Sequence, residues 1–119
     1  MVEQILTVTA EHLTGPLAVL RATGEIDRDS IQLLGDAAHE ALEQGAHQLI
    51  IDLAAVTFCD SSGLRLFVQL HRQTATRGGS LRLAALQPSL WTVLRATNLD
   101  RLLAAYPTVD EAVRAACAQ

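Results

Sequence analysis

Apolar residues follow two different periods along this chain, and the two kinds of block alternate. Short runs rich in Leu, Ile, Val and Thr are typical of strands, whereas apolar residues that repeat every three to four positions are typical of helices. The strand-like runs cover residues 4–9, 17–23, 48–53, 81–86 and 102–105, and the helical blocks cover residues 31–42, 64–77, 88–97 and 108–116. Strands separated by helices predict parallel strands joined by right-handed crossovers.

The first two strand-like runs are joined by a turn rather than by a helix. Thr14, Gly15 and Pro16 lie between them and form a strong turn signal, so we expect an antiparallel hairpin. Residues 48–53 are almost continuously apolar, which suits a central strand that pairs on both sides. The order β-β-α-β-α-β-α-β-α therefore predicts an α/β layer fold, with a mixed sheet of four to five strands and about four helices packed on it.

Residues that commonly begin or end helices stand at the boundaries of these blocks. We expect Asp29 or Ser30 to be the N-cap of the first helix, and Gly45 stands where a glycine often follows the last turn. Thr108 and Glu111 form a capping box at the start of the last helix. These signals agree with the apolar periods and support the predicted order of elements.

The length and composition indicate one globular domain over residues 1–119. Half of the residues are apolar and 18% are charged, which is typical of a folded chain. The net charge is −4 and lysine is absent, which argues against nucleic-acid binding, because such binding depends on clustered Lys and Arg. We expect a soluble cytoplasmic protein, since no signal peptide opens the chain and no apolar run approaches the roughly 20 residues of a membrane span.

Side chains that usually carry catalysis or bind metals form no recognisable pattern. Cys59 and Cys117 are expected to be reduced and largely buried thiols. No Cys and His pair has the spacing of a metal site, so we predict neither a metal nor another cofactor. Ser61 lacks the glycine two positions earlier that a hydrolase nucleophile needs, because Cys59 stands there. We therefore predict that the protein is not an enzyme.

The most informative segment covers residues 56–64, where a buried strand gives way to an amphipathic helix. Asp60, Ser61, Ser62 and Gly63 form the turn between them. The first N–H groups of a helix have no partner within the helix, and the helix dipole favours negative charge there. A phosphate on Ser61 would therefore occupy a site suited to an anion, and it would add about −1.5 to −2 charges. Taken alone, however, this tetrapeptide more often marks only the start of a helix.

Two motifs together resemble the signature of STAS domains. The first comprises residues 50–53 (Ile-Ile-Asp-Leu), 56–58 (Val-Thr-Phe) and 60–64 (Asp-Ser-Ser-Gly-Leu), and the second comprises residues 24–27 (Gly-Glu-Ile-Asp). The resemblance extends over nearly the whole chain and includes the order of elements. It implies a STAS-like fold and a role similar to that of the bacterial anti-sigma factor antagonists.

The resemblance also implies a phosphorylation switch. In these antagonists the unphosphorylated form captures an anti-sigma factor that is also a serine kinase, and so frees a sigma factor. The kinase then phosphorylates the serine after the motif aspartate, here Ser61, and a phosphatase resets the switch. Only this resemblance favours Ser61 over Ser62. The residues expected to bind the partner are Asp27, Asp60, Ser62, Gly63, Leu64, Arg65 and Leu66.

Arg65 departs from the family pattern, which often has a small residue after Gly-Leu. The predicted inward stripe of the helix comprises Leu64, Phe67, Val68, His71 and Ala75. Arg65 and Leu66 lie off this stripe, so we expect both to be exposed near the switch and to influence partner choice. The alternative is an ordinary solvated Arg and a singly exposed Leu.

The resemblance leaves three questions open. STAS-like domains also serve as interaction subunits of lipid or anion transporters and of stress-signalling complexes, so a stand-alone subunit of this kind is the alternative function. Some members are thought to bind nucleotides or lipids near the switch loop, which leaves a small ligand open. A free edge strand or an exposed Leu66 could support a weak dimer, so both a monomer and a weak dimer remain candidates.

Overall fold

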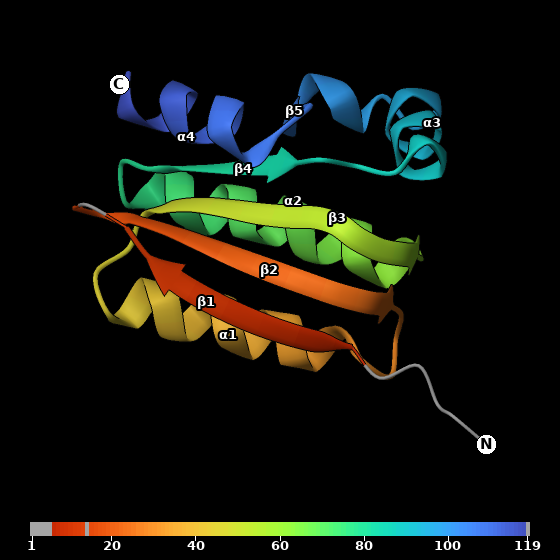
Figure 1. The fold of residues 1–119 in the computed structure, drawn as a ribbon, viewed down its shortest axis with the longest axis horizontal. Helices are drawn as coiled ribbons and strands as arrows, with labels where there is room; N and C mark the ends of the chain where they lie inside the picture. Colours follow the sequence, from red (N-terminus) through yellow and green to blue (C-terminus); the bar gives the residue numbers. More distant parts are fainter. Residues whose placement is uncertain (1–5, 14, 119) are drawn as a thin grey trace.

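Five strands in the described part of the chain form one mixed sheet with helices on both faces (Figure 1). The computed structural model describes residues 6–13 and 15–118. The strands are β1 (Thr7–His12), β2 (Leu17–Ile26), β3 (Gln48–Cys59), β4 (Ser80–Ala84) and β5 (Ala104–Tyr106). The helices are α1 (Ile31–Glu43), α2 (Ser61–Thr76), α3 (Pro88–Ala96) and α4 (Val109–Cys117), with a 3-10 turn, η1, at Leu99–Arg101. None of the helices within these described ranges is long and apolar enough to cross a membrane.

The strands lie side by side in the order β1-β2-β3-β4-β5. β1 and β2 pair antiparallel, whereas β2–β3, β3–β4 and β4–β5 are parallel pairs. The predicted hairpin, the mixed sheet and the order of elements are therefore confirmed. Residues 48–53 lie in β3, the central strand, as their continuous apolar character predicted.

The structure moves the boundaries of the first three strands. β1 pairs over Thr7–His12 rather than over residues 4–9; residues 4 and 5 lie outside the described residues, as does Thr14 of the predicted turn. β2 and β3 continue beyond their predicted ends, because their backbones keep pairing as far as Ile26 and Cys59 despite two register shifts. Backbone hydrogen bonds form whether or not the side chains alternate between apolar and polar. The pattern of side chains therefore did not indicate that β2 and β3 extend to Ile26 and Cys59.

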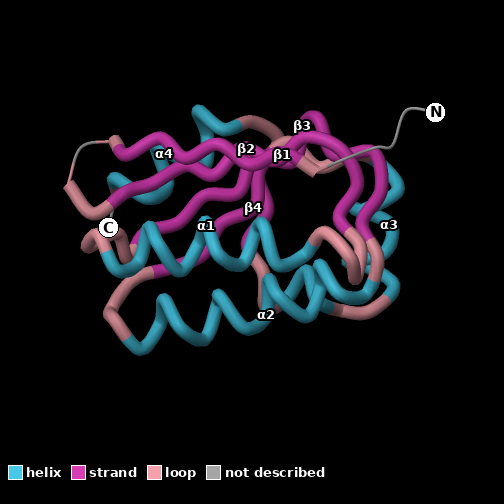
Figure 2. Tube along the Cα trace, turned by 90° about the horizontal axis from the view of Figure 1, so that it is seen from below, coloured by secondary structure: helices cyan, strands magenta, loops and turns pink. Residues whose placement is uncertain are grey.

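α1 and α2 lie together on one face of the sheet, and α4 lies on the other (Figure 2). The larger core fills the space under α1 and α2, where Leu34, Phe67 and Leu70 are fully buried. The smaller core lies under α4, where Ala112 and Ala116 pack against β2, β3 and β4. Where helices cover both faces, β2, β3 and β4 therefore carry apolar side chains on both sides.

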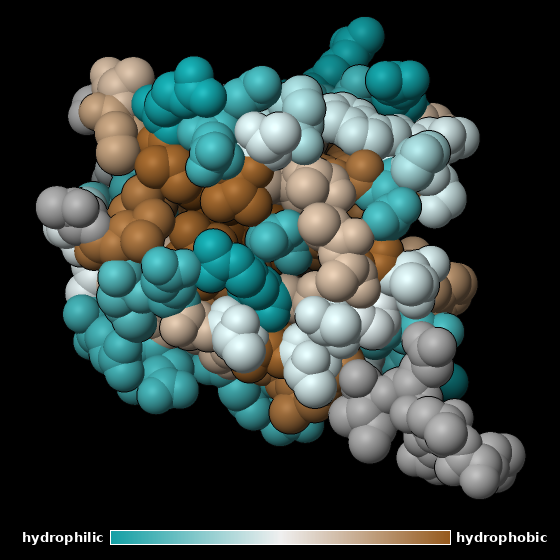
Figure 3. Space-filling view, viewed as in Figure 1, coloured by the Kyte–Doolittle hydropathy of each residue, from teal (hydrophilic) through white to brown (hydrophobic). Residues whose placement is uncertain are grey.

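α4 covers only part of its face of the sheet, and polar side chains occupy the rest. Arg21 on β2 forms ion pairs with Glu11 on β1 and with Asp52 on β3. Figure 3 shows polar side chains on this face beside an apolar area near α4. Exposed ion pairs contribute only about 0–1 kcal/mol each, so packing under the helices holds the sheet more strongly than these pairs do.

The buried face of α2 is shifted by one residue toward the N-terminus relative to the predicted stripe. Its buried residues are Gly63, Leu66, Phe67, Leu70 and Thr74. Leu66 is only 7% exposed, so the prediction that it is exposed was wrong, whereas Arg65 is exposed as expected. Ala75, predicted to face inward, is exposed. The physical reason is that α2 packs against α1 as well as against the sheet, so the buried face is rotated to bring Leu66 toward α1.

The last helix begins as predicted but presents its cysteine differently. The Thr108 hydroxyl oxygen accepts a hydrogen bond of 3.1 Å from the N–H of Glu111, which confirms the N-cap. Cys117 is exposed, so the prediction of a largely buried thiol was wrong there. α4 turns Ala112 and Ala116 toward the sheet, and the cysteine in its last turn points away from that face.

Candidate functional site

The two sequence motifs, one of which contains the predicted switch, meet at the ends of β2 and β3. These strands are parallel neighbours, so their carboxyl ends lie at the same edge of the sheet. The backbone N–H of Asp60 donates a hydrogen bond of 3.0 Å to the carbonyl oxygen of Ile26. Ligands commonly bind in α/β proteins at this edge. The loop that carries Asp27 therefore lies beside the start of α2, where it shares a hollow with Ser61.

Asp60, rather than a serine, is the N-cap of α2. Its Oδ1 accepts a hydrogen bond of 2.8 Å from the N–H of Ser62, and its backbone carbonyl accepts one of 3.1 Å from the N–H of Gly63. α2 consequently begins at Ser61 instead of at residue 64. Asp60 already supplies part of the negative charge that a helix N-terminus favours. An added phosphate would thus be a second anion at this position.

The two serines of the turn differ in accessibility. Ser61 is the first residue of α2, and its side chain is exposed. Ser62 is half-buried, and its N–H is held by Asp60. An enzyme that modifies a hydroxyl must reach it, so the structure adds a physical argument for Ser61 that the sequence did not contain.

Gly63 allows the first turn of α2 to pack closely against the sheet. It is buried, and a Cβ added there would lie 2.9 Å from Cγ2 of Ile26 and nearer still to Sγ of Cys59. Real Cβ atoms do not approach other heavy atoms so closely. Gly63 and Leu66 were both expected to bind a partner, but the structure places both in the packing beneath the surface.

The loop before α1 is fixed by its own polar side chains. Oδ1 of Asp27 accepts hydrogen bonds from the N–H groups of Asp29 (3.1 Å) and Ser30 (2.9 Å). The hydroxyl of Ser30 donates to the carbonyl oxygen of Glu25 at 2.9 Å and accepts from the N–H of Asp27 at 3.0 Å. Ser30 takes the predicted N-cap position, but its hydroxyl caps no helical N–H. The carboxylate of Asp27 orders this turn instead.

A hollow of about 280 Å³ lies between this loop and the start of α2. Its lining residues are Asp27, Arg28, Asp29, Asp60, Ser61 and Ser62. Three carboxylates and one guanidinium make its charge predominantly negative. Arg28 does not stand out in the sequence, although its position next to Asp27 in the loop is a signal for it.

Cys59 is a packed thiol rather than a reactive one. Burial, and secondarily the negative charge of Asp60, raise the pKa of the Cys59 thiol to about 12. The thiolate is the reactive form of cysteine, and it is scarce at neutral pH when the pKa is this high. Cys59 packs at the edge of the larger core, which supports the prediction that it acts as a small hydrophobic side chain.

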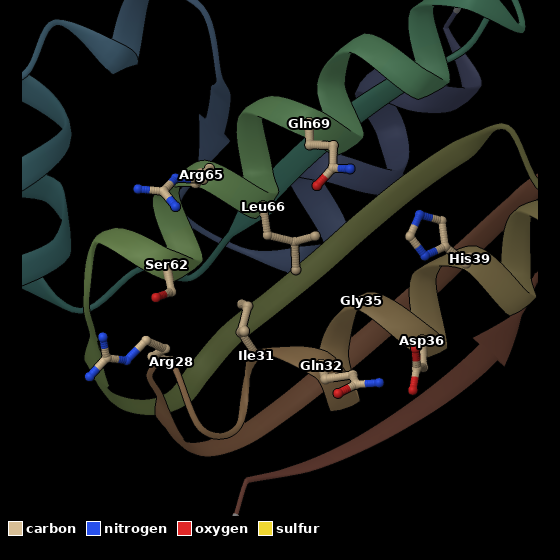
Figure 4. Close-up of a pocket in the computed structure, with 10 residues that line it drawn as sticks. All are labelled: Arg28, Ile31, Gln32, Gly35, Asp36, His39, Ser62, Arg65, Leu66 and Gln69. Carbon is tan, nitrogen blue, oxygen red and sulfur yellow. The ribbon is translucent and has the colours of Figure 1, made fainter.

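A second hollow, a groove of about 390 Å³, runs between α1 and α2. Figure 4 shows Arg28, Ser62 and Arg65 together at one end of it. Its other lining residues are Ile31, Gln32, Gly35, Asp36, His39, Leu66 and Gln69. This groove was not predictable from apolar periods, because it depends on how two helices pack. Gly35, in the middle of α1, is the sequence signal that points to it.

Two relatives of this chain are anti-sigma factor antagonists by name. The anti-sigma-B factor antagonist of Bacillus subtilis is 36% identical over 80 residues, which span 67% of this chain and 72% of that protein. A Thermotoga maritima protein assigned as an anti-sigma factor antagonist is 31% identical over 74 residues, which span 62% of this chain and 66% of that protein. The second match therefore covers slightly less than two thirds of the length of that relative.

Solved structures share the same architecture. An anti-sigma factor antagonist from Mycobacterium paratuberculosis has a TM-score of 0.84 at 29% identity, with 93% of each chain covered. The Bacillus cell fate determinant SpoIIAA in its phosphorylated form has a TM-score of 0.71 at 25% identity, with 91% of this chain and 97% of that chain covered. A murine anion transporter of the solute carrier 26 family has a TM-score of 0.73, but at 12% identity this likeness shows the fold alone.

The family comparison agrees with the motifs. The family model of the STAS domain matches residues 7–112, a range that contains all five described strands and the start of α4. The two predicted motifs lie inside this range, and the structure brings them together at one edge of the sheet. The chain therefore belongs to the STAS domain family.

Proposed function

We propose that this protein is an anti-sigma factor antagonist controlled by phosphorylation of Ser61. The observation that carries the proposal is the exposed Ser61 side chain at the first position of α2, beside the Asp27 loop, in a chain whose relatives bear this name. In this proposal the unphosphorylated protein binds an anti-sigma factor that is also a serine kinase, and so frees a sigma factor. Phosphorylation releases the partner, and a phosphatase restores the binding form.

The geometry explains how one phosphate can change binding without unfolding the domain. Ser61 is exposed, while the cap of α2 is the Asp60 carboxylate, so modification leaves the capping hydrogen bonds in place. A phosphate adds about −1.5 to −2 charges next to a hollow that already holds three carboxylates. A partner surface that fits the unmodified protein would then meet a strongly changed charge.

The proposed docking surface consists of residues around this hollow that the structure leaves accessible. Its members are Asp27, Asp60, Ser61, Ser62, Leu64 and Arg65, of which Ser61 and Arg65 are exposed and the others half-buried. Gly63 and Leu66 support this surface from beneath. Arg65 is the member that differs most from the usual family pattern, and we propose that it contributes to partner choice.

We propose that the protein contributes no catalytic group of its own. None of the described histidines lines the hollow at Ser61, and the Asp60 carboxylate there is engaged in capping α2. The Cys59 thiol stays protonated at neutral pH. The chemistry of phosphate transfer and removal thus belongs to the partner enzymes.

The test is phosphorylation by candidate anti-sigma kinases. The protein, Ser61→Ala and Ser62→Ala are each incubated with kinase and ATP, and intact mass is measured. We expect one added phosphate on the protein and on Ser62→Ala, and none on Ser61→Ala. Binding is then measured by calorimetry, where Ser61→Asp should bind more weakly than Ser61→Ala. Equal phosphorylation of Ser61→Ala would show that the switch position is wrong.

The alternative role as an interaction subunit of a transporter is supported by the fold alone. The transporter likeness has 12% identity, whereas named antagonists reach 36% over 80 residues. The genes that neighbour this one discriminate between the two roles directly. An adjacent kinase-like gene supports the antagonist, and an adjacent transporter gene supports the alternative.

A further inference from the structure

Arg28 and Arg65 lie on either side of the serine pair. Figure 4 shows Ser62 between the two arginine side chains at one end of the groove between α1 and α2. Both arginines are exposed. The ion pairs found in the described part of the chain involve only Arg21, so neither Arg28 nor Arg65 is neutralised by a carboxylate there.

Both arginines are placed to reach a phosphate on Ser61. Arg65 is four residues after Ser61 on α2, and side chains at this spacing are neighbours, with Cβ atoms about 5–6 Å apart. Arg28 lines the hollow that contains Ser61, and it also lines the groove that contains Arg65. The two guanidinium groups can therefore approach the same point from the loop and from the helix.

The negative charges around Ser61 make a cationic partner favourable for a phosphate there. Asp27, Asp29 and Asp60 line the same hollow, and each would repel a second anion. The helix N-terminus offers limited compensation, because Asp60 already accepts the N–H of Ser62. Arginine matches phosphate with paired N–H donors, and charge-assisted hydrogen bonds of this kind are about twice as strong as neutral ones.

We infer that Arg65, together with Arg28, binds the phosphate of phosphorylated Ser61. This inference rests on the proposed function, in which Ser61 is the modified residue. It also gives the unusual arginine after Gly63 and Leu64 a specific task. Phosphorylation then changes the docking surface twice, because it adds a dianion and withdraws two guanidinium groups that an acidic partner surface could otherwise use.

The test measures the ionisation of the phosphate itself. Phosphoserine is installed at position 61 during translation through an expanded genetic code, so that no kinase is needed. The second pKa of a phosphoserine is ordinarily about 6, and a 31P NMR titration reports it directly. Replacing Arg65 by Gln should raise this pKa by roughly half a unit, since a nearby cation favours the more charged form. The three carboxylates act equally in both proteins and cancel in the difference.

Arg72→Gln is the matched control, because Arg72 is also exposed on α2 but lies two turns beyond Arg65. It should leave the phosphate pKa unchanged. Arg28→Gln should raise the pKa, and added salt should weaken both effects. Circular dichroism confirms that each variant is folded.

A phosphate pKa that is the same in the parent, in Arg65→Gln and in Arg28→Gln would overturn the inference. That result would leave the proposed function standing. The proposed function is tested separately, by incubation with kinases and ATP. It is overturned if none of the candidate anti-sigma kinases modifies Ser61.

Discussion

Two helical glycines provide a paired test of how closely α2 packs on the sheet. Gly63→Ala would place a methyl group 2.9 Å from Cγ2 of Ile26 and nearer still to Sγ of Cys59. Overpacking of this kind costs about 1–3 kcal/mol, and here two atoms from two strands must move, so about 2–3 kcal/mol is appropriate. The gain in helix propensity from Gly to Ala offsets about 1 kcal/mol. We expect a net loss of about 1–2 kcal/mol in the free energy of unfolding.

Gly35→Ala is the matched control, because Gly35 is also buried inside a helix but has room. A Cβ there would meet only Cδ1 of Leu66, at an ordinary 3.8 Å. We therefore expect Gly35→Ala to stabilise the protein by about 0.5–1 kcal/mol. Urea unfolding of both variants gives the comparison, and Cys59→Ala combined with Gly63→Ala should recover part of the loss. Equal stability of the two glycine variants would refute the close approach at Gly63.

Three further predictions follow from which side chains are buried and which are exposed. Leu66→Ala should lower the free energy of unfolding by about 2–4 kcal/mol, whereas Arg65→Ala should change it by less than about 0.5 kcal/mol. Urea unfolding measures both values. Similar small effects for the two variants would mean that Leu66 is exposed. Iodoacetamide at pH 8 should modify the exposed Cys117 and spare Cys59, and rapid double labelling of the native protein, measured by intact mass, would contradict the raised pKa. Because that pKa rises from 9.0 to about 12, the protonated Cys59 should contribute stability below pH 9 that is lost as the pH rises toward 12, and Cys59→Ala should lack this dependence.

The sequence carried most of the fold, and the reasons for its failures are physical. Periods of two and of three to four residues identify strands and helices because they report which face is buried. They do not report where backbone pairing ends. For this reason the predicted run of residues 48–53 stops short of the observed end of β3 at Cys59. Nor do they report a second packing partner. Leu66 looked exposed on a helix resting on a sheet, and it is buried because α1 lies beside α2.

The candidate site was predictable only in part for a similar reason. Asp60 and Ser61 stand out in the sequence because residues of these types begin helices and because the family motif contains them. The sequence did not show that Asp60 caps the helix and that Ser61 is left exposed, since either residue type can cap a helix. Arg28 was not identified, because its importance depends on a loop that folds against α2 from a distant part of the chain.

The first turn of α2 separates the residues that hold the fold from Ser61, the residue that we propose is modified. Asp60 caps the helix with its carboxylate, and Gly63 turns inward against Ile26 and Cys59. Between them, Ser61 points to solvent and takes part in neither task. A helix rotates by about 100° per residue, so neighbouring positions in one turn necessarily face different surroundings. A charge can therefore be added at Ser61 without disturbing the cap or the packing, and a switch at this position needs no conformational change of the domain.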